Sequence, residues 1–526
     1  MSGTRYTSPL KNYGEVMTEV ERFNRFFKQC HENGVLMNAA ELLQQAARRW
    51  PHKTALLCQN SAMTYQELHF RATLFSKKLE AAGIQVSDNV IIICENSINF
   101  FIAYYGIWQT GAVIVPVNTF LHEHELHHII QDSHAKAIFV SDKLRSKIAA
   151  LSLSHNIIFG EQDIDTTTPV SELSYTIKKR NPDDMTALLY TSGTTGLPKG
   201  VMLSSRNILT NTAQAAASLD VLEGERIFAA LPLFHSYSQN GCLWTGILGG
   251  CTSIIIPKID RTALRDGLEK KPTIIFGIPG LYGLFCHLKN ISFNYVKYFV
   301  CGGDALPDKI RMGFELIFRR KLCNGYGLTE TSPFISINAQ DETLPTNTIG
   351  KPVVGVHAEI RDEAGKKITN FSSIGTLWVT GDNIMLGYYN APEATSTILH
   401  NGWLNTGDLA RYDSHGRIII CGRQKDIIIN KGIKIYPQEI ENIIMSHPLV
   451  TAVGVVGMKD NNEEVPVAYV AVREKTDTLI EELKTLCQQN LAAYKLPRRY
   501  FIEHELPTTA TGKVDKKVLR AKLASL

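Results

Sequence analysis

One glycine- and hydroxyl-rich segment stands between two apolar runs: LLYTSGTTGLPKGVMLSS, residues 188–205. Its glycines would let the backbone approach an anion closely, its hydroxyls would donate hydrogen bonds, and its lysine would supply positive charge. These candidate anion ligands are Thr191, Ser192, Gly193, Thr194, Thr195, Gly196 and Lys199. The helical pattern that follows would add the dipole of its first turn. A flexible surface loop is the alternative, and so many donors directly after an apolar run disfavour it.

This segment lacks the nucleotide-triphosphatase spacing, G-x-x-x-x-G-K-[ST]. Counted from Gly193, that spacing needs Gly at position 198, which is Pro. It also needs Ser or Thr after Lys199, where Gly200 stands. We therefore interpret the segment as an anion-binding loop of another kind.

A second Gly-rich turn, NGYGLTETSP at residues 324–333, adds an aromatic ring, a hydroxyl and a carboxylate. The ring of Tyr326 could stack on a purine, and Thr329 could donate to a phosphate. Glu330 could hold a hard cation such as Mg²⁺, which prefers oxygen ligands. As a bare pattern, the segment fits a plain turn nearly as well.

Two later segments each offer charged groups. Asp408 could bind vicinal ribose hydroxyls with the help of Arg423, although a structural ion pair explains both residues equally well. Lys513 follows a glycine in PTTATGKVDKKVLR, residues 507–520. A lysine so near the C-terminus is usually solvated, but the Pro/Thr/Gly surroundings favour a shaped loop.

The segment HELHH, residues 124–128, has the H-E-x-x-H spacing of zinc proteases. The extended form of that motif needs Gly at position 131, which is Gln. Leu126, Ile129 and Ile130 form an apolar stripe that leaves the histidines mostly on the polar face. We therefore interpret the segment as an amphipathic helix.

The composition predicts a globular protein. The 526 residues are 44% hydrophobic and carry a net charge of +4, which disfavours a nucleic-acid binder with its concentrated basic stripe. The ten cysteines include no C-x-x-C pair, as suits a reducing, cytoplasmic location. The N-terminus is too polar for a secretory signal. The apolar segment 241–256 is shorter than the roughly 20 residues of a membrane span, so we expect a buried helix, turn and strand; peripheral membrane contact stays open.

Apolar runs and helical patterns alternate before about residue 350. Residues 89–117 read as strand, helix and strand, which predicts a parallel or mixed sheet covered by helices. Closely spaced strands follow, and from 437 the pattern is compact α+β. We therefore expect four parts: an N-terminal extension (1–35), a large domain (36–423), a hinge (424–426) and a small C-terminal domain (427–526).

The motifs, in this order, resemble those of the acyl-activating adenylate-forming superfamily. Its members include acyl-CoA synthetases, 4-coumarate–CoA ligases, luciferases and peptide-synthetase adenylation domains. The resemblance covers nearly the whole chain, from residue 38 to residue 520, but not the first 35 residues. It implies an α/β fold with doubly wound subdomains, a barrel-like subdomain and a small α+β lid.

The resemblance implies roles for the candidate residues. The loop at 191–200 would clasp the β- and γ-phosphates of ATP, and Thr329 would lie near the α-phosphate. Glu330, with Thr191, would hold Mg²⁺, while Asp408 and Arg423 would bind the ribose. The wall around adenine and the α-phosphate would be Gly302, Gly303, Asn324, Gly325, Tyr326 and Gly327.

Other positions would serve the acyl group and the thiol. His235, in LPLFHSY (231–237), would gate the acyl pocket. Lys513 would reach across from the small domain, and Lys425 would lie at the hinge. We expect the pocket to include Tyr237, Ser238, Gly241 and Gly277, and the CoA thiol to pass Lys431 and Gly432.

The implied enzyme is an AMP-forming acid–thiol ligase. The substrate carboxylate would attack the α-phosphate of ATP, the small domain would rotate, and CoA would convert the acyl-adenylate to a thioester. A medium- or long-chain fatty acid is the expected acid, and an aryl acid such as a cinnamate is the alternative. Three rival functions differ in the acceptor or the chemistry: loading of a carrier protein's phosphopantetheine in trans, a catalytically inactive nucleotide-binding scaffold, and a phosphate-transferring kinase.

Overall fold

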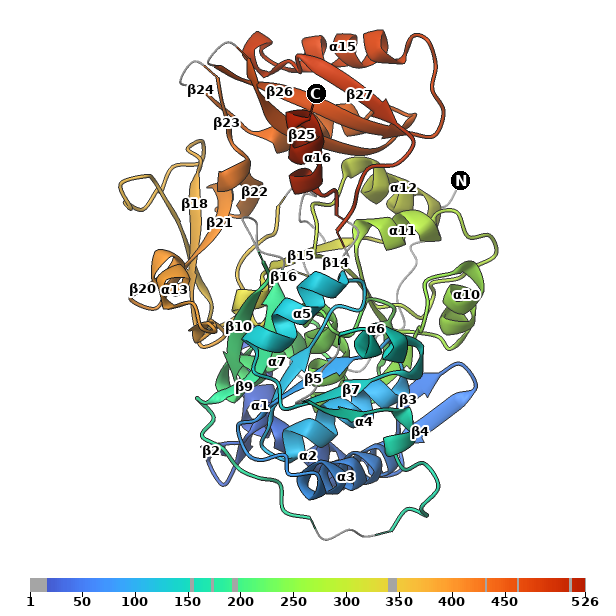
Figure 1. The fold of residues 1–526 in the computed structure, drawn as a ribbon. Helices are drawn as coiled ribbons and strands as arrows, with labels where there is room; N and C mark the ends of the chain where they lie inside the picture. Colours follow the sequence, from blue (N-terminus) through green and yellow to red (C-terminus); the bar gives the residue numbers. More distant parts are fainter. Residues whose placement is uncertain are drawn as a thin grey trace.

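The computed structural model describes residues 17–151, 156–171, 175–191, 197–338, 348–430, 433–460, 463–509 and 513–525. These residues form a large α/β region with a small domain above it (Figure 1). The small domain comes from the C-terminal part of the chain and has its own sheet and its own apolar core. The expected fold class, a large N-terminal region with a small C-terminal α+β domain, is confirmed.

The first sheet of the large region has β5 near its centre. Its order is β19 (Gly387–Tyr388), β10 (Lys199–Ser204), β9 (Met185–Thr191), β6 (Val113–Pro116), β5 (Asn89–Ile93), β7 (Ala137–Val140) and β8 (Ile157–Phe159). β5 pairs in parallel with both β6 and β7, and α4 (Ile98–Gln109) connects β5 to β6. This confirms the strand–helix–strand unit predicted for residues 89–117.

The second sheet is parallel in its middle. Its order is β16 (Phe334–Ile337), β15 (Cys323–Gly327), β14 (Tyr298–Cys301), β13 (Ile274–Gly277), β11 (Arg226–Ala229), β12 (Thr252–Ile255), β3 (Thr54–Cys58) and β4 (Ser61–Thr64). The apolar segment 241–256 forms the end of the π-helix η4 (Gln239–Trp244), α9 (Thr245–Leu248) and β12, as expected. None of the described helices has the length and apolar character that a membrane crossing needs.

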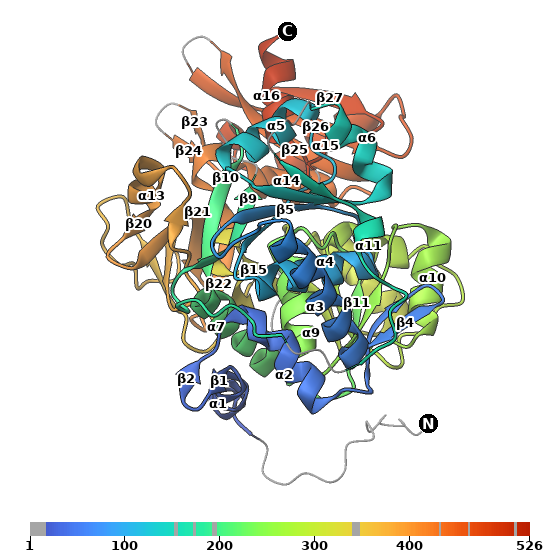
Figure 2. The same cartoon turned by 60° about the horizontal axis from the view of Figure 1, so that its bottom comes forward.

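Side-chain alternation along the strands builds the layers. Ile92 of β5 packs into a core shared by both sheets, whereas Ile91 and Ile93 pack on the other face against α5 (Glu123–Asp132). The nearly fully buried helix α4 lies between the sheets, as does α3 (Tyr65–Ala81) (Figure 2). The outer face of the second sheet packs against α10 (Arg261–Glu269), α11 (Pro279–Phe285) and α12 (Asp308–Phe318).

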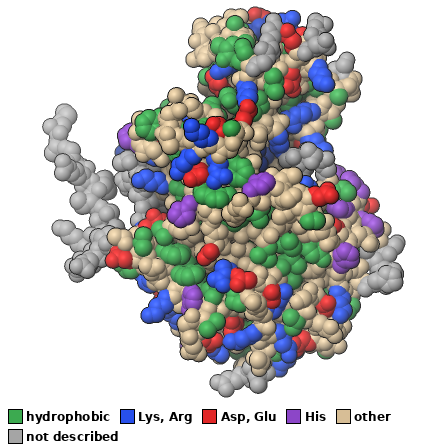
Figure 3. All heavy atoms as spheres, turned by 90° about the vertical axis from the view of Figure 1, so that its left-hand side faces the viewer, with side chains coloured by type: hydrophobic (Ala, Val, Ile, Leu, Met, Phe, Trp, Pro, Cys, Tyr) green, Lys and Arg blue, Asp and Glu red, His purple; other side chains and the backbone are tan. Residues whose placement is uncertain are grey.

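An antiparallel third sheet leads to the small domain. Its strands are β17 (His357–Arg361), β18 (Gly375–Thr380), β21 (Trp403–Tyr412), β20 (Leu399–His400) and β22 (Ile418–Arg423). The turn η6 (Gln424–Asp426) then enters the small domain. That domain contains β23 (Ile428–Asn430), β24 (Ile433–Ile435), α14 (Pro437–Met445), β25 (Val450–Asp460), β26 (Glu463–Val472), α15 (Leu479–Asn490), β27 (Arg499–Glu503) and α16 (Lys516–Ala524). Figure 3 shows it as a lobe above a narrowed waist, on a face where acidic and basic side chains are interspersed.

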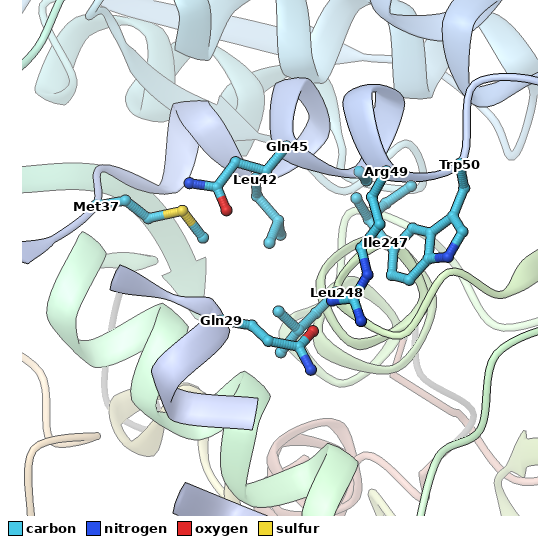
Figure 4. A pocket seen from close by; sticks show the side chains of 9 residues that line it. Gln29, Met37, Leu42, Gln45, Arg49, Trp50, Ile247 and Leu248 are labelled. Carbon is cyan, nitrogen blue, oxygen red and sulfur yellow. The ribbon is translucent and has the colours of Figure 1, made fainter. Parts of the chain in front are cut away.

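The N-terminal segment packs on the buried helix α7 (Ser205–Ser218). α1 (Glu19–Gln29) is followed by the hairpin of β1 (His31–Glu32) and β2 (Val35–Leu36), and Arg22 Nε donates to the Ala217 carbonyl at 2.8 Å. A cavity of about 50 Å³ remains between α1, α2 (Leu42–Arg49) and α9, with Met37, Trp50 and Leu248 in its lining (Figure 4). Ligand pockets are typically several hundred Å³, so this cavity is too small to be the substrate site.

Candidate active site

The phosphate loop connects two antiparallel strands. Thr191, at the end of β9, pairs with Lys199, at the start of β10, and its hydroxyl donates to the Lys199 carbonyl at 3.5 Å. The predicted ligands Ser192, Gly193, Thr194, Thr195 and Gly196 lie outside the described residues. Thr191 and Lys199 therefore stand opposite each other at one end of the ladder between β9 and β10.

The predicted support from the dipole of α7 is wrong. β10 follows the loop directly, and its last residue, Ser204, pairs with Met185 at the far end of the hairpin. α7 begins only at Ser205, so its N-terminus lies at the opposite end of β10 from the loop. The sequence KGVMLS becomes a strand because it pairs with β9, a contact that the local pattern does not contain.

Glu330 and Lys199 both contact the side chain of one tyrosine, Tyr388. Glu330 lies in the 3₁₀ turn η5 (Thr329–Thr331), and Tyr388 Oη donates to its Oε1 at 2.7 Å. Lys199 Nζ lies 5.6 Å from the centre of the Tyr388 ring. In front of the turn, a Cβ on Gly327 would lie 1.9 Å from the Pro333 carbonyl oxygen, so this position requires glycine. The structure thus brings the metal candidate to the base of the phosphate loop.

The neighbouring wall residues follow from the register of two parallel strands. Cys301, the last residue of β14, pairs with Asn324 in β15, so Gly302, the next residue, lies beside Gly325 and Gly303 follows it at the carboxyl end of β14. Ligands in such sheets bind outside the carboxyl ends of the strands. Asn324 Nδ2 donates to the Thr348 carbonyl at 3.5 Å, and a Cβ on Gly302 would lie 3.2 Å from the ring of Tyr237. The wall therefore adjoins the expected acyl pocket.

Asp408 is the buried centre of a second group. Its side chain is 3% exposed, Tyr326 Oη donates to Oδ2 at 2.5 Å, and Arg423 Nε forms an ion pair with Oδ1 at 2.6 Å. Asp408 and Arg423 stand opposite each other in the pairing of β21 with β22. Burial raises the pKa of Asp408, and the nearby positive charge of Arg423 opposes this rise. Tyr326, predicted to lie against adenine, is thus tied to the ribose candidate.

Lys513, in the small domain, interacts electrostatically with the group around Asp408. The charges that act on it include those of Asp304, Arg423 and Asp408, all from the large region, and burial lowers its pKa. The same lysine acts on His235, because burial, together with the charge of Lys513, lowers the pKa of His235 to about 4. The imidazole is therefore neutral at pH 7. The chain before α16 runs down from the small domain toward the large region (Figure 1).

The acyl-pocket candidates surround aromatic rings. Tyr237, in α8 (Ser236–Ser238), is buried and donates from Oη to the Val300 carbonyl at 2.9 Å. A Cβ on Gly241 would lie 2.8 Å from the Phe276 ring, and one on Gly277 would lie 2.8 Å from the Tyr282 ring. Ser238 differs because its hydroxyl donates to the Leu231 carbonyl at 3.0 Å. These glycines therefore make room for rings of the protein itself.

Three residues of the site carried no signal in the sequence. Tyr388 joins Glu330 to Lys199, Ser236 Oγ lies 3.3 Å from Thr329 Oγ1, and Asp304 lies near Lys513. Each acts on a partner distant in the chain, so no local pattern marks it. The predicted Lys425 lies in η6, where burial lowers its pKa, and Lys431 and Gly432 lie outside the described residues. In the histidine-rich helix α5, His128 Nε2 lies 3.1 Å from the Pro198 carbonyl, at the base of the loop.

Comparison with known proteins decides the family. Residues 43–389 match the AMP-binding enzyme family, and residues 439–513 match the AMP-binding enzyme C-terminal domain. The chain belongs to the AMP-binding enzyme family. Within this family it is similar to a long-chain-fatty-acid–CoA ligase from Bacillus subtilis (strain 168), at 32% identity over 521 residues, which cover 91% of this chain and 93% of that protein. A feruloyl-CoA synthase from Amycolatopsis sp is 31% identical over 482 residues, covering 90% and 96%.

Solved structures of related AMP-binding enzymes bear on the domain arrangement. The chain superposes on ATP-bound MatB from Rhodopseudomonas palustris with a TM-score of 0.85, at 28% identity, over 92% of this chain and 99% of that one. For apo MatB, at the same identity and coverage, the TM-score is 0.75. The structure of this AMP-binding enzyme is therefore more similar overall to the ATP-bound structure than to the apo structure. The predicted class, an AMP-forming acid–CoA ligase that uses ATP and CoA, is confirmed at the level of the family.

Proposed function

We propose that this enzyme activates a medium- or long-chain fatty acid as its acyl-adenylate and then transfers the acyl group to CoA. One observation carries the proposal: the charge of Lys513, in the small domain, acts on His235, and the charges of Asp408 and Arg423, in the large region, act on Lys513. The positive charge of Lys513, close to residues proposed to bind the nucleotide, would stabilise the negative charge that develops around the α-phosphorus during adenylation. The resemblance to the Bacillus subtilis ligase supports the choice of acid.

Each proposed role uses one group of the site. Lys199 would bind the β- and γ-phosphates with the 192–196 loop, and Asp408 would accept the ribose hydroxyls, since a carboxylate has lone pairs beyond its bonds to Tyr326 and Arg423. Thr329 would donate to the α-phosphate. Lys513 would neutralise charge there during attack by the substrate carboxylate. Neutral His235 would border the acyl group without adding a charge that opposes Lys513.

Magnesium fits the donor set as a companion of ATP. Mg²⁺ usually takes one or two protein carboxylates and completes its shell with phosphate oxygens and waters. Glu330 accepts the Tyr388 hydroxyl at Oε1, which orients the carboxylate and leaves it able to bind a cation. Thr191 would contribute at most its hydroxyl. When bound, the ion would neutralise phosphate charge during adenylation.

The second step would need the small domain to turn. Withdrawal of Lys513 would open the site to the CoA thiol, with η6 and Lys425 as the hinge and with Lys431 and Gly432 beside the thiol. The thiol would then attack the mixed anhydride, giving the thioester and AMP. The proposed domain limits are 36–423 and 427–526, separated by residues 424–426.

The test is carboxylate-dependent ATP–pyrophosphate exchange across a panel of fatty and aryl acids, with AMP release measured with and without CoA. We expect exchange with fatty acids of about eight carbons or more and AMP release that CoA accelerates. Highest kcat/KM on a cinnamate would overturn the fatty-acid proposal, and ADP as the product would support a kinase instead. Absence of exchange with every acid would favour a catalytically inactive scaffold.

An aryl acid remains the second candidate substrate, because the feruloyl-CoA synthase is nearly as similar as the fatty-acid ligase. The acceptor needs a separate comparison. A carrier protein loaded in trans would give a higher rate with a holo-carrier protein than with free CoA, and we expect the reverse.

A further inference from the structure

A lysine of the large region donates hydrogen bonds to three main-chain carbonyl groups of the small domain. Lys309 lies in the first turn of α12, and its Nζ donates to the carbonyls of His447, Pro448 and Val450 at 3.1, 2.8 and 2.9 Å. An ammonium group has three N–H donors. The contact therefore uses the whole hydrogen-bonding capacity of Lys309 on the main chain of one turn.

The turn that receives Lys309 is suited to a cation. It follows α14 directly and connects it to β25, so the carbonyls lie at the negative end of the α14 dipole. The turn is also held from within: Val450 N donates to the His447 carbonyl at 3.1 Å, and His447 Nε2 lies 3.1 Å from Glu482 Oε2. The acceptor site thus belongs to the small domain and depends on no side chain of the large region.

The same stretch of the large region also faces Lys513. Asp304, in the loop that begins with Gly302 and Gly303, is an acidic group whose charge acts on Lys513. Lys309 follows Asp304 by one short loop, so one segment meets the small domain at its catalytic lysine and at the α14–β25 turn. A second contact is close by, since Arg473 Nη2 of the small domain lies 3.4 Å from His287 Nε2.

We propose that Lys309 is a positioning residue that holds the small domain in the orientation that places Lys513 in the site. Its contact with the α14–β25 turn favours the adenylation step and must break before the small domain can turn for the thioester step. This inference rests on the proposed two-step reaction. Because the side chain of Lys309 lies at the exposed edge of the contact, it can be changed without opening a core.

The test uses Lys309→Met, which keeps the length of the side chain and removes its charge and donors. ATP–pyrophosphate exchange should fall about three- to tenfold, the effect of losing charge-assisted hydrogen bonds at a partly exposed site. Thioester formation from supplied acyl-adenylate should not fall. Lys309→Arg, whose guanidinium can also donate to carbonyls, should restore most of the exchange. In the substrate-free enzyme, reductive methylation of Lys513, measured by mass spectrometry, should be faster in Lys309→Met than in the wild type.

The matched control is Glu363→Gln. It removes the exposed ion pair of Glu363 with Lys434, which also joins the two domains, and it should leave exchange and methylation of Lys513 unchanged. Wild-type values for both measurements in Lys309→Met would overturn the inference, as would an equal loss in both half-reactions. The methylation readout needs no turnover. It therefore tests the contact even if the wild-type enzyme activates none of the acids, an outcome that would count against the proposed function alone.

Discussion

At the residue scale, Tyr388 links two charged groups that lie far apart in the sequence. Its hydroxyl donates to Glu330 and its ring faces Lys199, so one side chain orients the metal candidate beside the phosphate loop. Tyr388→Phe removes the hydroxyl and keeps the ring. We expect exchange to fall about tenfold or more, because a hydrogen bond to a charged group contributes about 1.5–3 kcal/mol. The Mg²⁺ concentration for half-maximal exchange should rise.

The matched control for that experiment is Tyr389→Phe. The hydroxyl of Tyr389 contacts Asn89 at 3.5 Å, away from Glu330. This variant should keep the wild-type Mg²⁺ dependence. If Tyr388→Phe lowers the rate without changing the Mg²⁺ dependence, the proposed metal role of Glu330 is contradicted.

Lys513 is the residue on which we expect the first step to depend most. Lys513→Ala removes the positive charge that would face the α-phosphate, and we expect adenylation to fall by about 10² or more. Thioester formation from supplied acyl-adenylate should be nearly unchanged. Lys517→Ala, at an exposed position in α16, controls for the loss of a small-domain lysine. Comparable losses in the two half-reactions would contradict the role of Lys513.

At the element scale, η6 joins the large region to the small domain. Lys425→Pro fixes one φ angle and removes one N–H, so it should stiffen this turn. We expect exchange to stay within about twofold of the wild type, while thioester formation falls about tenfold or more, because only the second step needs the domain to turn. Lys425→Ala separates the loss of the side chain from the stiffening. A defect confined to adenylation would show that the hinge lies elsewhere.

Elements with a strong local pattern were predictable, and those made by distant pairing were not. Residues 89–117 and 241–256 formed the expected elements because their apolar runs and helical periodicity are local. β10 was not predicted as a strand, since KGVMLS becomes a strand only through its ladder with β9. A strand of this second kind can be predicted from the sequence only when its partner strand is known.

At the scale of the whole molecule, the candidate site was predictable as a set of motifs but not as a set of contacts. Asp408 and Arg423 were paired from the sequence, and they stand in register on adjacent strands. The meeting of Lys513 with His235 depends on the orientation of two domains, which no local pattern encodes. Asp304 and Lys309 were missed for the same reason, because their partners belong to the other domain.

Acid should destabilise the whole fold through two histidines that are neutral in the folded protein. Burial, helped by the charge of Arg48, lowers the pKa of His69 to about 4, and the pKa of His235 is also lowered to about 4. An unfolded histidine titrates near pH 6.5, so between pH 6.5 and 4 the unfolded chain binds more protons than the folded one. The free energy of unfolding should therefore decrease as the pH is lowered from 6.5 to 4, by about 1 kcal/mol per pH unit for each such histidine.

His69 isolates this effect because it lies away from the candidate site. It sits on α3, where its Nδ1 is 3.2 Å from Gln109 Nε2, and His69→Gln replaces the ionisable ring with a neutral amide. Urea unfolding of both proteins at several pH values should show a gentler loss of stability in the variant between pH 6.5 and 4. His357→Gln, at an exposed position, serves as the matched control. Identical slopes for His69→Gln and the wild type would mean that His69 does not oppose protonation in the folded protein.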